Sequence, residues 1–143
     1  MKTQNFKTHG RLVTGYHKVL YPMLIAGFIG SCINLSHSFA NGNYYSASLI
    51  VLLFLTVMLS AYFGRSFALK AQDRAIRAEE NMRHFMMTGK PLPSALRMRQ
   101  IIGLRFSSDE EFLELIKDAI ENNLKEKQIK MKIKNWKADF YRV

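Results

Sequence analysis

The middle third of the sequence has no charged residue. Positions 19–64 are 46 consecutive residues without Asp, Glu, Lys or Arg, although the chain of 143 residues contains 21 basic and 11 acidic side chains. Apolar runs of 18 residues or more with no charge are typical of membrane-crossing helices and not of soluble domains. The sequence therefore divides into an apolar segment and a strongly charged remainder with a net charge of +10.

Cysteine is almost absent, which excludes several kinds of site. Cys32 is the only cysteine, so the chain has neither an intramolecular disulfide nor a CxxC metal or redox motif. Because Cys32 lies inside the apolar segment, we expect its thiol to act as a small packing group.

The uncharged segment is too long for one membrane crossing. A helix needs about 20 residues to cross the hydrocarbon core, so 46 residues fit two crossings and a turn. Asn41-Gly42-Asn43, preceded by Ser36-His37-Ser38, supplies turn residues near the midpoint. Backbone in lipid must satisfy its own hydrogen bonds, which two segments achieve only as helices. The sequence predicts an all-α protein with a two-span transmembrane hairpin at residues 19–39 and 44–63.

Basic residues flank this hairpin on one side. Those before it and after it are Lys2, Lys7, Arg11 and Lys18, and then Arg65, Lys70, Arg74 and Arg77. The short connection between the spans has none, so the positive-inside rule predicts both termini in the cytoplasm. A cleaved signal peptide ending at Ser38-Phe39-Ala40 is the less favoured alternative, because the apolar region is longer than the usual 7–15 residues and a second apolar segment follows.

Small and polar residues recur along one stripe of each expected span. They are Gly27, Gly30, Ser31 and Asn34 in the first, and Thr56, Ser60 and Gly64 in the second. Such stripes allow helix backbones to approach closely in lipid, where no hydrophobic force drives association. We favour packing within the hairpin, and a docking face for another membrane subunit stays open.

The periodicity predicts that the second span continues as an amphipathic helix over residues 65–88. One face carries a seam of apolar and small residues: Phe67, Ala71, Ala75, Ala78, Met82 and Phe85. The seam is suited to close packing against a helix of this chain or of another copy. The opposite face offers i,i+4 pairs, Asp73 with Arg77, Glu79 with Arg83 and Glu80 with His84. Gly89, with two prolines soon after it, should end the helix.

Residues 89–143 are predicted to form two or three short helices in the cytoplasm. Residues 1–18 are predicted to be a separate basic segment, also in the cytoplasm. Residues 94–106 form a basic helical segment, and Ser108 with Glu111 has the spacing of a capping box at the start of the next helix. Apolar residues of that helix share one face: Phe112, Ile116, Ala119 and Ile120. Residues 125–137 fit either a helix or a strand; we favour a helix because no partner strand is apparent.

Six lysines make the last segment strongly basic. They are Lys125, Lys127, Lys130, Lys132, Lys134 and Lys137. They could bind anionic lipid or an RNA surface, or form only a solvated face that obeys the positive-inside rule. Nucleic acid is the less favoured partner, because Trp136 is the only stacking aromatic among the lysines.

No motif points to catalysis. The four histidines have no carboxylate or cysteine at metal-ligand spacing, and the sequence has no phosphate-binding loop or nucleophile elbow. We expect a protein that is not an enzyme, with no cofactor and no metal site.

The C-terminal residues resemble a known group of proteins. Leu104-Arg105-Phe106-Ser107-Ser108-Asp109-Glu110-Glu111-Phe112, then Ile133-Lys134-Asn135-Trp136-Lys137-Ala138-Asp139 and Tyr141-Arg142-Val143, are similar to the C-terminal signature of an uncharacterised family of small bacterial two-span membrane proteins. The resemblance implies a multi-pass location in the bacterial cytoplasmic membrane and brings no activity with it.

These observations favour an accessory or scaffolding subunit of a membrane complex. Its expected partners are the lipid bilayer and either other membrane subunits or further copies of the chain. The alternative is a membrane-tethered module that docks electrostatically on anionic lipid or on RNA, including a ribosome, through the six lysines.

Overall fold

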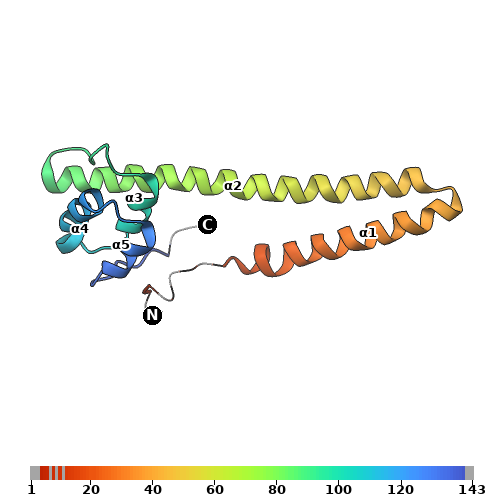
Figure 1. Cartoon of the computed structure of the whole chain (residues 1–143), viewed down its shortest axis with the longest axis horizontal. Helices are drawn as coiled ribbons and strands as arrows, with labels where there is room; N and C mark the ends of the chain where they lie inside the picture. The colour runs from red at the N-terminus through yellow and green to blue at the C-terminus, as the bar shows by residue number, and fades with distance from the viewer. Residues whose placement is uncertain (1–3, 7, 9, 11, 141–143) are drawn as a thin grey trace. The chain divides into compact units, whose positions relative to one another are not determined.

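The computed structural model describes residues 4–6, 8, 10 and 12–140, and its regular elements are helices (Figure 1). In chain order they are η1 (Gly15–Leu20), α1 (Tyr21–Asn41), α2 (Tyr44–Thr88), α3 (Met98–Leu104), α4 (Asp109–Glu121) and α5 (Glu126–Lys132). One isolated antiparallel bridge, between Ser107 and Trp136, is the β pairing that the described residues contain. The predicted all-α class is confirmed.

The chain separates into two compact units. One contains residues 11–68, and the other combines residues 69–143 with the first ten. The boundary falls inside α2, which continues without a break from Tyr44 to Thr88. The described part of the N-terminal segment therefore belongs with the charged C-terminal half.

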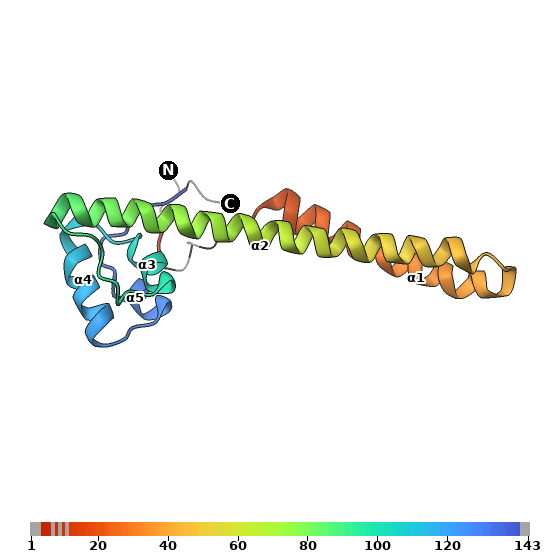
Figure 2. The same ribbon diagram turned by 90° about the horizontal axis from the view of Figure 1, so that it is seen from above.

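The first unit is an antiparallel pair formed by α1 and the first part of α2 (Figures 1 and 2). The turn is at Gly42, whose positive φ of 71° is a left-handed conformation that glycine adopts without steric cost. Ser36 and Ser38, expected near a turn, are helical instead: their hydroxyls donate to the carbonyls of Ile33 and Asn34, both at 2.7 Å. Helices can retain serine when the hydroxyl bonds back to the preceding turn.

The start of the first helix has wide π-type turns. Pro22 has no N–H and cannot donate to the carbonyl one α-helical turn before it. In η1 the ladder has the longer i→i−5 step, shown by the bond from the Tyr21 N–H to the Tyr16 carbonyl. The apolar helical segment thus begins at Gly15, before the predicted start at Val19.

Two helices are long and apolar enough to cross a membrane. They are Gly15–Asn41, with 27 residues, and Tyr44–Thr88, with 45 residues. Very little of either apolar stretch is buried within the chain, which leaves large side chains such as Leu52, Leu53 and Leu59 exposed.

The second unit has its own hydrophobic core. The end of α2 packs with α3, α4 and α5 (Figure 2) around a cluster of buried side chains. The core residues are Ile76, Leu96, Ile101, Leu104, Phe106, Phe112, Leu115, Ile116, Ala119, Leu124, Ile129 and Ile133. The predicted apolar face of α4 is confirmed, since Phe112, Ile116 and Ala119 are buried in this cluster.

Two residues of α3 explain how the short helices fit together. Gln100 is buried, and its amide donates to the carbonyl of Ala119 in α4 at 2.9 Å and to that of Leu124, after α4, at 3.0 Å. Gly103 lies against α5: a Cβ there would be 3.3 Å from the Ile129 side chain. This close contact fixes α3 against α5.

Three local predictions need correction. The segment 94–106 is helical only in α3, and residues 94–97 and 105–106 lie outside the helix. The helix expected over residues 125–137 ends with α5 at Lys132, and Ile133 is extended. Trp136 then forms an isolated antiparallel bridge with Ser107, a pairing that the sequence did not reveal.

Candidate functional site

The small residues of the two apolar helices do not form one shared interface. Gly27 contacts the Phe54 ring so closely that a Cβ could not be added without moving the ring, and Ser31 is buried. A Cβ added at Gly30 would meet no neighbour, and Asn34 is exposed. Along α2, Thr56, Ser60 and Gly64 are all exposed.

Other side chains line the hairpin. Leu24, Ser31 and Ser38 of α1 and Ala47 of α2 are buried. At the end of the hairpin away from its turn, the Tyr16 hydroxyl donates to the Ala61 carbonyl at 2.5 Å. Within the hairpin, Gly27 contacts Phe54 of α2 and Ser31 is buried, whereas Thr56, Ser60 and Gly64 are exposed.

The predicted seam of α2 is exposed along its whole length. Phe67, Met82 and Phe85 are 61%, 59% and 52% exposed, and Ala71, Ala75 and Ala78 are exposed as well. The face that packs in the second unit is polar at its centre. It buries Ile76, Glu80 and His84, so packing of the seam within this chain is not what the structure shows.

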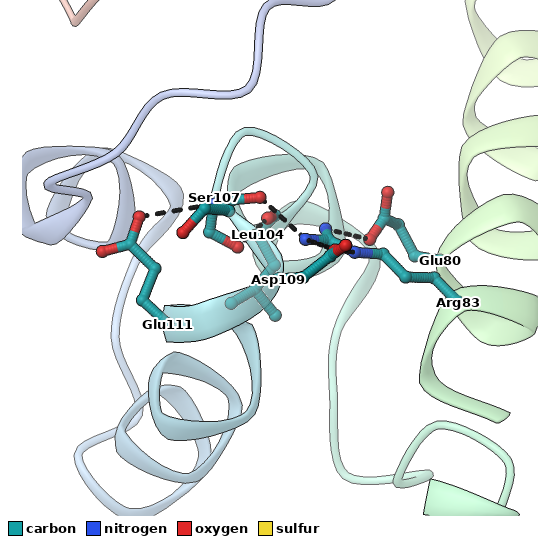
Figure 3. Close-up of polar contacts among 7 residues, drawn as sticks. Glu80, Arg83, Leu104, Ser107, Asp109 and Glu111 are labelled. Carbon is teal, nitrogen blue, oxygen red and sulfur yellow. Dashed lines mark hydrogen bonds and ion pairs between the residues drawn. The ribbon is translucent and has the colours of Figure 1, made fainter. Parts of the chain in front are cut away.

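Arg83 joins α2 to the start of α4 through a network of charged hydrogen bonds (Figure 3). Its guanidinium lies 3.1 Å from a Glu80 oxygen and 2.6 Å from an Asp109 oxygen, and it donates to the Ser107 carbonyl at 2.8 Å. It also lies 4.0 Å from the centre of the Phe112 ring. The predicted pairing of Arg83 with Glu79 is replaced by pairing with Glu80.

Glu80 is the most buried carboxylate of this network. Burial raises the pKa of Glu80 above the ordinary value of 4.5, and the nearby Arg83 guanidinium offsets only part of this effect. Its expected pair with His84 is also replaced. The His84 ring contacts the Lys90 carbonyl at 2.8 Å, which helps close the chain after the helix ends.

The six lysines do not act as one free surface. Lys130 is buried and pairs with Glu126 at 2.6 Å, and Lys132 pairs with Asp118 at 2.5 Å. The hydrogen bond from Lys132 lowers the pKa of Asp118, and hydrogen bonding from Lys130 lowers the pKa of Glu126 although burial opposes it. The other four lysines are exposed: Lys125, Lys127, Lys134 and Lys137.

A cavity of about 720 Å³ opens in the second unit where α3 meets α5. Five of its lining residues are cationic, one is acidic, and the others are apolar or neutral. The lining consists of Phe6, Arg97, Met98, Arg99, Gln100, Leu124, Lys125, Glu126, Lys127 and Lys130. Ligand sites commonly combine an apolar wall with a few converging polar groups, and this volume is within their range.

No group of three or more His, Cys, Asp or Glu side chains is placed to hold a metal ion among residues 4–6, 8, 10 and 12–140. Cys32 is a free, exposed thiol on α1. The polar groups that gather in the second unit are instead the Arg83 network and the cations of the cavity.

A protein-family model matches residues 1–143, and therefore the whole sequence. The chain belongs to DUF6526. This is a family of unknown function. No curated protein and no solved structure matches the chain.

In this member of DUF6526, residues 104–112 and 133–139 of the C-terminal signature fold against each other, while residues 141–143 lie outside the described part of the chain. Glu111 accepts backbone hydrogen bonds from Lys134 at 3.0 Å and Asn135 at 3.1 Å. The Ser108 N–H donates to the Asn135 carbonyl, and the Lys137 N–H donates to the Phe106 carbonyl at 2.8 Å. The carboxylate predicted as part of a capping box therefore also anchors the chain after α5.

Two features of this DUF6526 chain escaped sequence reasoning. The first is the central position of Arg83, whose partners Ser107 and Asp109 are more than twenty residues away in the sequence. The second is the use of Phe6 in the cavity wall. For Phe6, the available signal was an isolated aromatic residue in a polar N-terminal segment.

Proposed function

We propose that the chain is a non-catalytic integral membrane protein of the bacterial cytoplasmic membrane, with both termini in the cytoplasm, that acts as an accessory or scaffolding subunit. The observation that carries this proposal is the exposed apolar surface of the two long helices. Monomeric soluble proteins rarely expose contiguous apolar patches larger than a few hundred Å². A bilayer would cover such a surface.

The basic residues on either side of the hairpin support the proposed orientation. Arg65 and Lys70 follow the apolar part of α2, Lys18 precedes that of α1, and the turn at Gly42 has no basic residue nearby. The charged second unit would then fold in the cytoplasm, where its ion pairs are in contact with water.

The exposed faces of α2 support a role in assembly. The stripe of Thr56, Ser60 and Gly64 suits close contact between helices in lipid. The seam that ends at Phe85 lies after the apolar part of α2, and it suits contact with an apolar face of another helix. Each would bind a helix of another subunit or of a second copy.

Photocrosslinking in intact membranes tests this role. A photoreactive residue replaces Ala78 in the seam, and the matched control replaces Glu114, which is exposed on α4. We expect specific adducts with another membrane protein, or with a second copy, from position 78 only. Equal labelling from both positions, together with a strictly monomeric mass after gentle solubilisation, would contradict the proposal.

Docking through the lysines has less support than assembly through helix faces. The buried Lys130 and the paired Lys132 are committed to contacts within the chain. Exposed lysines near an anionic leaflet contribute about 1 kcal/mol each, so four of them would bind weakly and with strong salt dependence. Docking on RNA or a ribosome stays the alternative for this segment.

A further inference from the structure

We propose that the cavity between α3 and α5 binds one anionic amphiphile, a phosphate or carboxylate head with an apolar chain. The proposal rests on the charges at the rim of the cavity, on the apolar side chains in its wall and on its size. All of the lining residues belong to the second unit. The inference therefore does not depend on the assembly role proposed above.

The rim has more positive charge than its own acid can neutralise. Among the described residues of the lining, Glu126 is the one acid, and two cations share it: Arg99 at 3.2 Å and Lys130 at 2.6 Å. Arg97 donates to the neutral side-chain oxygen of Asn123. In the part of the chain that the structure describes, no acid pairs with Lys125 or Lys127.

Lys130 is buried, whereas Arg97, Arg99, Lys125 and Lys127 are exposed at the opening of the cavity. An amphiphile bound in the cavity would displace water next to these cations, and the lower local dielectric constant would strengthen their attraction for its head group. The cations come from α3, from the connection before it and from the start of α5, so they converge on one opening. A phosphate or carboxylate head group would satisfy them through charge-assisted hydrogen bonds.

The wall of the cavity is unsuited to a small inorganic anion alone. Phe6 and Met98 are half-buried and Leu124 is buried, and together they present apolar surface to the interior. The polar Gln100 beside them is already committed, since its amide donates to the carbonyls of Ala119 and Leu124. An alkyl chain would cover this apolar surface, and its removal from water favours binding at about 25 cal/mol per Å².

The test uses a dodecyl phosphate that carries a diazirine in its alkyl chain. The full chain is placed in phosphatidylcholine nanodiscs and irradiated with the probe, and the labelled peptides are identified by mass spectrometry. This readout separates binding in the cavity from partitioning of the probe into lipid. We expect labelling at peptides containing Phe6, Met98 or Leu124.

Matched variants show whether the rim charges act. Lys125→Gln with Lys127→Gln removes two exposed cations of the cavity and should lower the apparent affinity about thirtyfold. The control pair, Lys117→Gln with Lys134→Gln, removes the same charge from exposed positions outside the lining and should leave labelling unchanged. Circular dichroism of all variants checks that the helices are retained.

Competition distinguishes the ligand class and its source. Unlabelled dodecyl phosphate should compete, whereas inorganic phosphate and uncharged dodecyl maltoside should not. A loss of labelling in nanodiscs that contain phosphatidylglycerol would identify a bilayer lipid as the occupant, and retained labelling would identify a free amphiphile. The proposal would be overturned if labelling were unchanged by Lys125→Gln with Lys127→Gln. It would also be overturned if dodecyl maltoside abolished labelling as fully as unlabelled dodecyl phosphate does.

Discussion

Arg83 holds two parts of the second unit together, although its side chain looks like one half of an ordinary surface pair in the sequence. It is 11% exposed, and its partners come from α2 itself, from the residues before α4 and from the first residue of α4. A buried charge without a partner is energetically costly, so the guanidinium needs these acceptors, and Glu80 needs the guanidinium. The largest single-residue effects on stability should therefore lie here.

Replacing Arg83 with Met should destabilise the second unit by about 2–4 kcal/mol, because Glu80 would remain buried without its cation. Hydrogen exchange of the full chain measures the effect, through faster exchange of amides in α4. Arg77→Met is the control, since Arg77 is exposed on the same helix. Equal protection in both variants would show that the network adds nothing.

Glu80 gives the stability a defined pH dependence. Because its folded-state pKa is raised, its protonated form contributes stability that is complete below the ordinary value of 4.5 and is lost as the pH rises through the raised pKa. The unfolding free energy of the wild type, measured relative to Glu80→Gln, should fall as the pH increases across this window. Glu114→Gln, on the exposed side of α4, corrects for the general loss of a carboxylate. A difference that rises with pH would contradict the assignment.

At the scale of elements, α2 combines two kinds of packing in one helix. Its first part contacts α1 through Phe54, and its last part contacts the short helices through Ile76, Glu80 and His84. Its other faces, which carry Ser60 and the seam, are not covered by the described residues of this chain. The helix thus has surface available for contacts beyond one copy.

The contact between Gly27 and Phe54 predicts a specific packing effect in the hairpin. Gly27→Ala should cost about 1–3 kcal/mol, because the added methyl group must displace the ring. Gly30→Ala should have little effect, since a Cβ there meets no neighbouring atom. Unfolding by sodium dodecyl sulfate in mixed micelles compares the two variants.

A second substitution separates crowding from loss of helix flexibility. Phe54→Leu should relieve most of the penalty of Gly27→Ala, because a smaller side chain leaves room for the methyl group. An unchanged penalty in the double variant would mean that the ring is not the cause.

At the scale of the whole molecule, an apolar hairpin is combined with a charged helical unit that has a core of its own. The N-terminal segment joins that unit: the Asp139 N–H donates to the Gln4 side chain at 2.7 Å, and the Gln4 amide donates to the Asp139 carbonyl at 3.3 Å. The two ends of the described chain are therefore tied together. This agrees with the proposed location of both termini on one side of a membrane.

That location can be checked with reporters fused at the two kinds of position. A reporter fused after Val143 should lie in the cytoplasm and be inaccessible from outside the cell. A reporter inserted at Gly42 should be accessible from outside. The protein should also remain with the membrane after extraction at alkaline pH, because the apolar helices and not the lysines would hold it there. Release into solution, or an external C-terminus, would refute the proposed topology.

Strong local signals predicted much of the secondary structure. The turn at Gly42, the end of α2 before Gly89 and the start of α4 after Ser108 all follow from backbone and capping preferences near the residues concerned. The 3.6-residue period likewise predicted the burial of Phe112, Ile116 and Ala119 in α4, although it missed Leu115 and Ile120 is only partly buried. The same period could not show which face of α2 is covered, since the apolar seam is exposed and the buried face contains Glu80 and His84.

The sequence by itself determined the all-helical class, the turn at Gly42, the end of α2 before Gly89 and the division into apolar and charged parts, because each depends on residues close together in the chain. Only the tertiary structure decided that Arg83 meets Asp109, that Trp136 pairs with Ser107 and that Phe6 and Lys127 line one cavity. These contacts join residues far apart in sequence, and their energies depend on burial, which no local pattern specifies.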